Sequence, residues 1–196
     1  MLNINIGGVK KWDKVSPQIR SNWKVLDVSG KPDYKYDLNS ELPFPLRDSS
    51  VDNYYCSHTL EHIYPQVLPF VLGEIYRTLK QSGVFRIVVP DIKKAIIKYT
   101  INDKKWLQHS GGPTAHRDFY PETCLGYLMS WFYSTPKGGS RTGHRMVFDL
   151  ETLYYYLQRA GFKTMLESLF CKGSSVFAGL DFPRHKDTSI YMEAGK

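Results

Sequence analysis

The chain is poor in cysteine and has no long apolar run. Its 196 residues include three cysteines, Cys56, Cys124 and Cys171, which are odd in number and far apart. This spacing argues against a disulfide framework or a CxxC metal site and predicts reduced thiols in a cytoplasmic protein. No apolar stretch approaches the roughly 20 residues that cross a bilayer. The first residues also lack the basic start and long apolar region of a secretory signal.

The sequence also lacks repeats, low-complexity segments and a visible interdomain linker. A chain of 196 residues without such features predicts one domain spanning residues 1–196. The formal net charge is +7, but the basic residues are scattered and form no continuous tail. They fit either a solvated basic surface or attraction to an anionic partner.

Apolar segments predict strands that alternate with helices. The segment 2–6 alternates apolar and polar residues and runs into the glycine pair Gly7–Gly8, as a first strand does before a tight turn. The further predicted strands are "WKVLDV" at 23–28, "DNYYCS" at 52–57, "VFRIVVPD" at 84–91, and the closing pair "TMLESLF" at 164–170 and "SIYMEA" at 189–194. The closing pair is expected to be antiparallel.

Two helices are predicted from apolar residues at helical spacing. The first carries Leu68, Leu72, Ile75 and Leu79, and Gly83 is expected to end it. The second covers residues 149–161, with Asp149 as the N-terminal cap and Gly161 as the stop. The order of elements predicts a doubly wound, Rossmann-like, mostly parallel α/β sheet with an antiparallel C-terminal strand.

Three segments are expected to meet at one edge of this sheet. They are the Gly7–Gly8 turn, the strand end at Asp27 and the Ser57–His58 turn, each of which follows a predicted strand. In open α/β sheets, ligands bind beyond the carboxyl ends of the strands, where the strand order reverses. The three segments therefore predict a ligand site at that edge.

Several motifs resemble a known family. They are "NINIGG", "NWKVLDV", and, between Leu42 and Asp91, "LPF", "D-x-S-x-D", "CSHxLEH" and "YRxLKxxGxxRIxVPD". Together they resemble a class I S-adenosylmethionine-dependent methyltransferase. The greatest similarity is to the small stand-alone group found among surface-polysaccharide genes, and it covers nearly the whole chain.

The resemblance implies the cofactor S-adenosyl-L-methionine and a set of residues that bind it. The glycine turn would let the backbone approach the cofactor, Asp27 would bind the ribose hydroxyls, and Asp37 with Leu38 would embrace the adenine. Ser57 and His58 would flank the methionine moiety or the acceptor. The expected cofactor-binding residues are thus Asn5, Gly7, Gly8, Asp27, Asp37, Leu38 and Ser57.

Two features depart from the family pattern. Val9 stands where the family usually has another glycine, so its side chain would crowd the amino-acid end of the cofactor. The gap between Val28 and Tyr34 is also too short for the crossover helix that normally joins parallel strands. The fold is therefore expected to be truncated between its second and third strands.

Residues 111–145 interrupt the α/β pattern and are expected to form an inserted cap on the substrate side. This segment is rich in aromatic, Arg and His residues, which suit a sugar or an anionic group. Histidine is well suited to take a proton near neutral pH, so His58, His144 and His116 are the candidate catalytic bases for O-methylation. The expected acceptor is a small molecule or a glycan, with RNA as the alternative, and the segment could also be a purely structural cap.

Other functions are weighed against this one. A non-catalytic protein of the same fold that binds a ligand or partner stays open, whereas the absence of G-x-G-x-x-G argues against a nicotinamide-dependent oxidoreductase. His58, Glu61 and His62 have the spacing of metal ligands on a helix. No third, distant ligand stands out, so no metal site is predicted. The oligomeric state is not indicated by the sequence.

Overall fold

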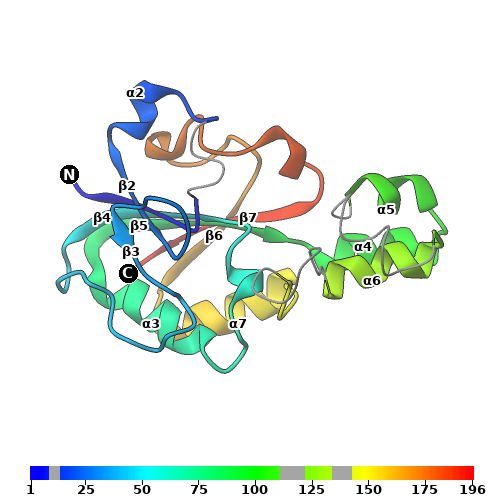
Figure 1. Cartoon of the computed structure of the whole chain (residues 1–196), viewed down its shortest axis with the longest axis horizontal. Helices are drawn as coiled ribbons and strands as arrows, with labels where there is room; N and C mark the ends of the chain where they lie inside the picture. Colours follow the sequence, from blue (N-terminus) through cyan, green and yellow to red (C-terminus); the bar gives the residue numbers. More distant parts are fainter. Residues whose placement is uncertain (9–13, 111–121, 134–142) are drawn as a thin grey trace.

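Seven strands form a single sheet in the order β3-β2-β1-β4-β5-β7-β6 (Figure 1). The computed structural model describes residues 1–8, 14–110, 122–133 and 143–196. The strands are β1 (Asn3–Ile6), β2 (Trp23–Asp27), β3 (Tyr34–Lys35), β4 (Val51–Ser57), β5 (Leu79–Pro90), β6 (Thr164–Ser168) and β7 (Ser189–Gly195). Strands β3, β2, β1, β4 and β5 are parallel, and β7 is antiparallel to both of its neighbours. The predicted Rossmann-like fold with an antiparallel C-terminal strand is confirmed.

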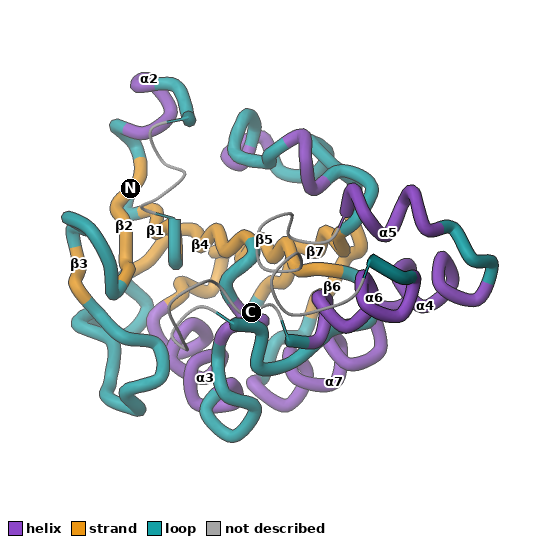
Figure 2. The backbone as a smooth tube through the Cα atoms, turned by 45° about the vertical axis from the view of Figure 1, so that its right-hand side comes forward, coloured by secondary structure: helices purple, strands orange, loops and turns teal. Residues whose placement is uncertain are grey.

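One face of the sheet is covered by α3 (Leu68–Thr78) and α7 (Leu150–Ala160), which lie below it in Figures 1 and 2. Side chains that alternate along each strand point to opposite faces. In β4, Tyr54 packs into the main core on the helical side, and Tyr55 packs into a second cluster on the other side. Both faces are therefore buried, as a parallel sheet requires.

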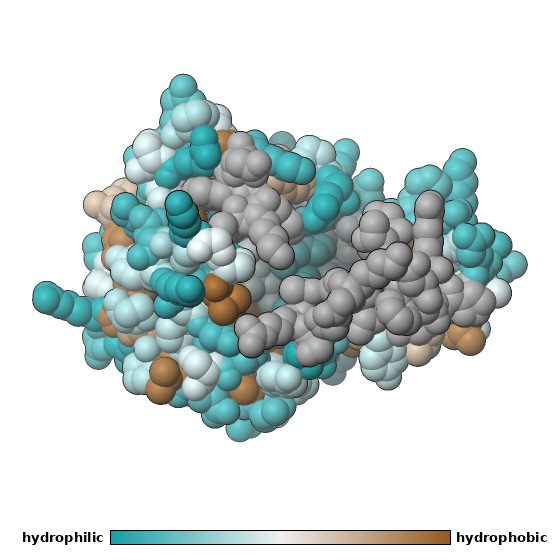
Figure 3. Space-filling model, in the orientation of Figure 1, coloured by the Kyte–Doolittle hydropathy of each residue, from teal (hydrophilic) through white to brown (hydrophobic). Residues whose placement is uncertain are grey.

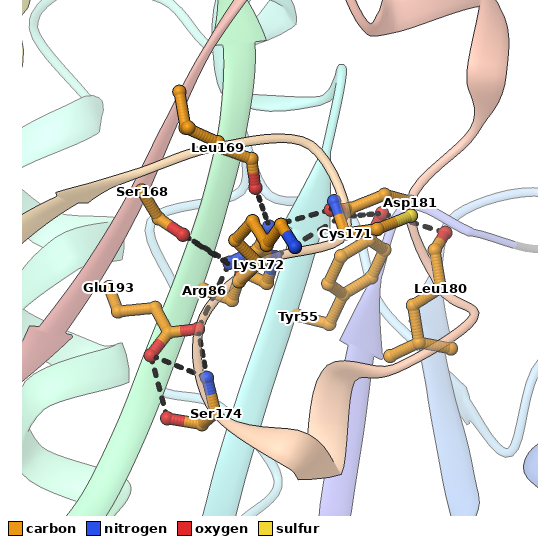
Figure 4. Close-up of polar contacts among 10 residues, drawn as sticks. All are labelled: Tyr55, Arg86, Ser168, Leu169, Cys171, Lys172, Ser174, Leu180, Asp181 and Glu193. Carbon is orange, nitrogen blue, oxygen red and sulfur yellow. Dashed lines mark hydrogen bonds and ion pairs between the residues drawn. The ribbon is translucent and has the colours of Figure 1, made fainter.

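The other face is covered mainly by irregular chain. Residues 169–188 and helix α2 (Pro17–Arg20) lie across this face. The only helices within residues 169–188 are the short η2 (Ser175–Phe177) and η3 (Pro183–His185). Figure 4 shows how this segment is held by Arg86 of β5. The buried guanidinium pairs with Asp181 at 2.6 Å and with Glu193 of β7 at 2.9 Å. Specific ion pairs thus fasten chain that has little regular structure of its own.

A small helical lobe projects beyond the end of β5 (Figure 1). Its helices are α4 (Ile92–Thr100), α5 (Lys104–Ser110) and α6 (Cys124–Phe132), which share a separate apolar cluster. The chain leaves the sheet at Asp91 and returns at Phe148, where the two residues form an isolated parallel bridge. The Ile92 N–H also donates to the Phe148 carbonyl at 2.9 Å. The lobe is therefore inserted between two residues of the main body that contact each other.

The predicted strands and the second predicted helix are present, but α4 and α5 were not predicted, and the insertion begins at Ile92 instead of residue 111. Strand β3 follows β2 without an intervening helix, and α7 has Asp149 as its cap and a left-handed Gly161 at its end. The expected end of the preceding helix at Gly83 is wrong. Helix α3 ends at Thr78, β5 begins at Leu79, and Gly83 lies inside that strand. A side chain at position 83 would meet the Asp52 carbonyl at 2.7 Å, so close strand packing explains this glycine.

The described residues on the face shown in Figure 3 are mainly hydrophilic. On the face shown in Figure 3, the described apolar residues are scattered among polar ones. None of the helices in the described part of the chain has the length and apolar character needed to span a membrane.

Candidate active site

The pairing register brings three of the predicted segments to the same level of the sheet. Ile6 pairs with Leu26 on one side and with Cys56 on the other, so the next residues, Gly7, Asp27 and Ser57, are neighbours at the carboxyl edge. The sheet order reverses between β1 and β4, which is where such folds bind ligands. The expected meeting of these segments is confirmed.

The glycine turn after β1 has a structural explanation of its own. Gly7 has φ +71°, and its N–H donates to the Leu26 carbonyl at 2.9 Å. A Cβ at Gly7 would lie 2.3 Å from Thr59 Oγ1, and one at Gly8 would lie 1.8 Å from Asn5 Nδ2. Asn5 is itself buried inside β1. Close packing within the chain therefore requires both glycines, and Asn5 supports the turn from below.

Asp27 closes β2 with its side chain nearly buried. Its Oδ1 accepts hydrogen bonds from the Ser29 N–H at 2.9 Å and from the Ser29 hydroxyl at 3.0 Å. The residue is 8% exposed at the edge where the glycine turn lies. A carboxylate in this position is a strong hydrogen-bond acceptor for ligand hydroxyls.

Asp37 and Leu38 follow β3 on the same edge. The Tyr36 N–H donates to the Asp27 carbonyl at 3.0 Å, which holds the loop against β2. Asp37 is exposed and accepts from the Asn39 N–H at 2.9 Å, whereas Leu38 packs against the main core. The pair therefore presents one polar and one apolar group beside the Asp27 strand end.

His58 sits on a strained turn directly after β4. Its φ is +51°, a region that non-glycine residues seldom adopt. Its Nε2 lies 2.9 Å from Ser189 Oγ, its Nδ1 lies 3.4 Å from Glu61 Oε1, and its ring stacks on His185 at 3.5 Å between centroids. Contacts on both nitrogens and on one ring face define the orientation of this imidazole.

A cluster of Glu61, His62 and His144 lies next to this turn. One ligand atom from each residue lies within 4.8 Å of those from the other two. His144, which is distant in the sequence, thus joins Glu61 and His62, two of the three residues whose spacing resembles that of metal ligands. The Arg145 N–H donates to the Glu61 carbonyl at 2.7 Å, and this bond joins the chain at 143–145 to the 3-10 turn η1 (Leu60–His62).

The electrostatics of the cluster favour an ionised carboxylate and a neutral imidazole. Burial would raise the pKa of Glu61, but the close contact with His58 and the charges of His62 and His144 lower it to about 2. Burial lowers the pKa of His144 below its ordinary value of 6.5, against the opposing pull of Glu61. Glu61 was not among the expected catalytic residues. The signal that could have found it is its place between two histidines in "SHTLEH".

Aromatic and basic side chains continue this edge toward the lobe. The Arg145 guanidinium lies 4.0 Å from the centroid of the Tyr64 ring, and Tyr64 is 38% exposed. The His144 Nδ1–H donates to the Trp131 carbonyl of α6 at 2.6 Å. Residues from the inserted segment thus reach the turn that follows β4. Two expected participants, Val9 and His116, lie outside the described residues.

Residues 18–87, from α2 through most of β5, match the family described as a methyltransferase domain. No curated protein sequence matches the chain significantly. Among solved structures, a SAM-dependent methyltransferase from Archaeoglobus fulgidus is similar, with 16% identity and a TM-score of 0.57 over 100% of this chain and 86% of that one.

Two further structures have the same fold. The 1,6-didemethyltoxoflavin N1-methyltransferase of Burkholderia thailandensis, solved with S-adenosylhomocysteine, shares 13% identity and a TM-score of 0.52 over 100% of this chain and 70% of that one. A SAM-dependent methyltransferase from Thermotoga maritima shares 14% identity and a TM-score of 0.53, over 99% and 81% of the two chains. At these identities the likeness shows the fold. The domain match over residues 18–87 and the shared fold are both those of methyltransferases.

Proposed function

We propose that the protein is an S-adenosylmethionine-dependent O-methyltransferase that acts on a small-molecule or glycan hydroxyl. The observation that carries the proposal is the grouping of Gly7, Asp27 and Ser57 at the reversal point between β1 and β4. Fold and domain match supply the reaction class. The type of acceptor rests on the residues around this edge and on the resemblance to methyltransferases found among surface-polysaccharide genes.

The cofactor would lie across the carboxyl ends of β1, β2 and β4. We assign the ribose hydroxyls to the Asp27 carboxylate, the amino-acid end to the backbone at Gly7–Gly8, and the adenine to Asp37 and Leu38. Ser57 would flank the methionine moiety, and Asn5 would keep the turn in shape. The donor set fits the group because it pairs a nearly buried carboxylate with a partly exposed glycine turn at the same sheet edge. When bound, S-adenosylmethionine supplies an electrophilic methyl group on a sulfonium centre.

Methylation of a hydroxyl also requires a group that accepts its proton. Of the three histidines expected in this role, we favour His58, because Glu61 at Nδ1 holds its ring and sets Nε2 as the proton-accepting atom. In this structure Ser189 Oγ lies beside that atom, where an acceptor hydroxyl would have to be. His144 turns its Nε2 toward Glu61 and His62 instead. His116 stays a candidate from the sequence.

The proposal of a sugar or small-molecule acceptor rests on the side chains at the edge of the sheet that faces the lobe. Tyr64, Arg145 and His62 gather there on two segments far apart in the sequence. Aromatic rings beside Arg and His side chains suit a hydroxylated ring or an anionic substituent. RNA is the alternative acceptor, and the charge of +7 is the feature in its favour.

Isothermal titration calorimetry with S-adenosylmethionine and S-adenosylhomocysteine tests the cofactor site. We expect the unmodified protein to bind both, and Asp27→Ala to weaken binding by about tenfold to over a hundredfold, because charge-assisted hydrogen bonds contribute roughly 1.5–3 kcal/mol. The matched control is Glu151→Ala, which removes an exposed carboxylate from the first turn of α7. Unchanged affinity in folded Asp27→Ala would remove Asp27 from the ribose site.

The acceptor is tested by release of S-adenosylhomocysteine in the presence of a panel of free sugars, glycans, small phenols and short RNAs. Turnover with a hydroxylated sugar supports the proposal, and turnover with RNA alone would replace the acceptor class. Lack of binding to either cofactor form, even at millimolar concentration, would favour the non-catalytic alternative.

A further inference from the structure

The cluster of Glu61, His62 and His144 has the composition of a metal site. Its three candidate ligand atoms lie within 4.8 Å of one another, and the Glu61 side chain is only 2% exposed. Neither Glu61 carboxylate oxygen makes a hydrogen bond of normal geometry with the described residues. Three lone-pair donors that lie close together in a partly buried space repel one another unless a cation or a proton lies between them.

Hydrogen bonds to two backbone carbonyls determine which ring nitrogen of His62 and of His144 faces the other two residues of the cluster. The His62 Nδ1–H donates to the Gly143 carbonyl at 3.1 Å, and the His144 Nδ1–H donates to the Trp131 carbonyl at 2.6 Å. Both Nε2 atoms are therefore the ones directed to the cluster. Histidines that bind metals usually donate their other ring N–H to a carbonyl or carboxylate in this way.

Glu61 is supported from behind by a further relay. His58 Nδ1 lies 3.4 Å from Glu61 Oε1, and His58 Nε2 lies 2.9 Å from Ser189 Oγ. Ligating carboxylates are commonly oriented by such second contacts. Each of the three inward-facing residues thus has a partner that orients it: His58, directly after β4, for Glu61, the Gly143 carbonyl for His62, and the Trp131 carbonyl of α6 for His144.

We propose that Glu61, His62 and His144 bind a divalent transition-metal ion such as Zn²⁺. Two imidazoles and a carboxylate form a recurrent donor set for zinc and for non-haem iron, and three protein ligands leave coordination positions open. Donors around one zinc ion at about 2.0–2.2 Å lie roughly 3–3.5 Å apart, so small side-chain rotations would close the present spacing.

The proposed ion would lie close to the cofactor edge. Thr59, two residues before Glu61, packs against Gly7 of the glycine turn. The cluster therefore lies near the glycine turn at the carboxyl edge of the sheet. Binding of the ion does not depend on methyl transfer, so it can be measured without cofactor or acceptor.

The test uses the full chain, stripped with a chelator and then titrated. Zn²⁺ binding is measured by calorimetry, and Co²⁺ binding by its visible absorption, which reports a protein-bound site of low coordination number. We expect one equivalent of each metal. Loss of an outer partner typically costs 10–100-fold in affinity, so His144→Ala and Glu61→Gln should each lose at least that much.

The matched control is His109→Ala, which removes an exposed histidine of α5 whose Nδ1 lies 2.7 Å from the Lys105 carbonyl. It should leave metal binding unchanged. Circular dichroism checks folding, and His62→Ala, at a side chain 32% exposed, replaces any variant that fails to fold. Absence of a one-equivalent site in the unmodified protein, or equal binding in folded His144→Ala, would overturn the proposal.

Discussion

Replacing Arg86 by Met should strongly destabilise the protein. Arg86 lies in β5 with its side chain 1% exposed, and all three of its guanidinium nitrogens are hydrogen-bonded. Met keeps much of the apolar stem but leaves Asp181, also 1% exposed, and Glu193 without their cation. Breaking a buried ion pair from one side costs about 3–5 kcal/mol, because the remaining charge stays buried and uncompensated.

That cost is a large part of the roughly 5–15 kcal/mol that holds a typical domain folded. For a chain of this size it corresponds to a fall of about 6–20 °C in the midpoint of thermal unfolding. Urea unfolding followed by tryptophan fluorescence measures the change in unfolding free energy. Trp23 is a suitable reporter, because it contacts Phe177 in the segment that Arg86 holds.

Two further variants separate the buried charge from simple loss of packing. Adding Asp181→Asn to Arg86→Met removes one stranded charge, so the double variant should be more stable than Arg86→Met alone. Lys24→Met breaks an exposed pair with Asp33 and should cost no more than about 1 kcal/mol. A loss below about 1 kcal/mol in Arg86→Met, or no recovery in the double variant, would refute the reasoning.

Two other predictions concern acid stability and the glycine turn. The hydrogen bond from Arg77 holds the pKa of Glu74 below its usual 4.5. The stabilisation is therefore present above about pH 4.5 and is lost as the pH falls, so Glu74→Gln should flatten the acid limb of the unfolding free energy. Gly7→Ala should destabilise by at least about 1–2 kcal/mol, because φ is positive and Thr59 is too close. Gly73→Ala, with nothing within 4 Å of the new Cβ in α3, should instead stabilise by up to about 1 kcal/mol in thermal melts, and a loss there would contradict the helix argument.

Most of the fold could be predicted because its signals are local. The Asp149 cap and Gly161 stop define α7, and the short connection after Asp27 leaves no room for a helix before β3. The end of α3 could not be predicted in the same way. Leu79 continues the helical spacing of apolar residues, yet it is already the first residue of β5, since a buried leucine satisfies either pattern.

The candidate site, too, could be predicted from the sequence only where the signals are local. The strand ends at Gly7 and Asp27 could be placed because parallel strands end at a common edge. The meeting of His144 with Glu61 could not, because 83 positions separate them and the link is a backbone hydrogen bond from Arg145. Neither periodicity nor spacing encodes that contact, which arises only when the chain returns from the helical lobe.

The bridge between Asp91 and Phe148 makes the lobe an exchangeable module. Entry and exit are joined by backbone contacts, so the sheet is closed whatever the length of chain between them. Because loop-closure entropy grows only slowly with length, residues 92–147 could be lengthened, shortened or grafted at small thermodynamic cost to the sheet. His144 lies just before the return point, so such a graft would alter the proposed acceptor side while the strand ends at Gly7 and Asp27 stay as they are. The residues that the inserted lobe contributes to this edge can therefore change independently of the strand ends at Gly7 and Asp27.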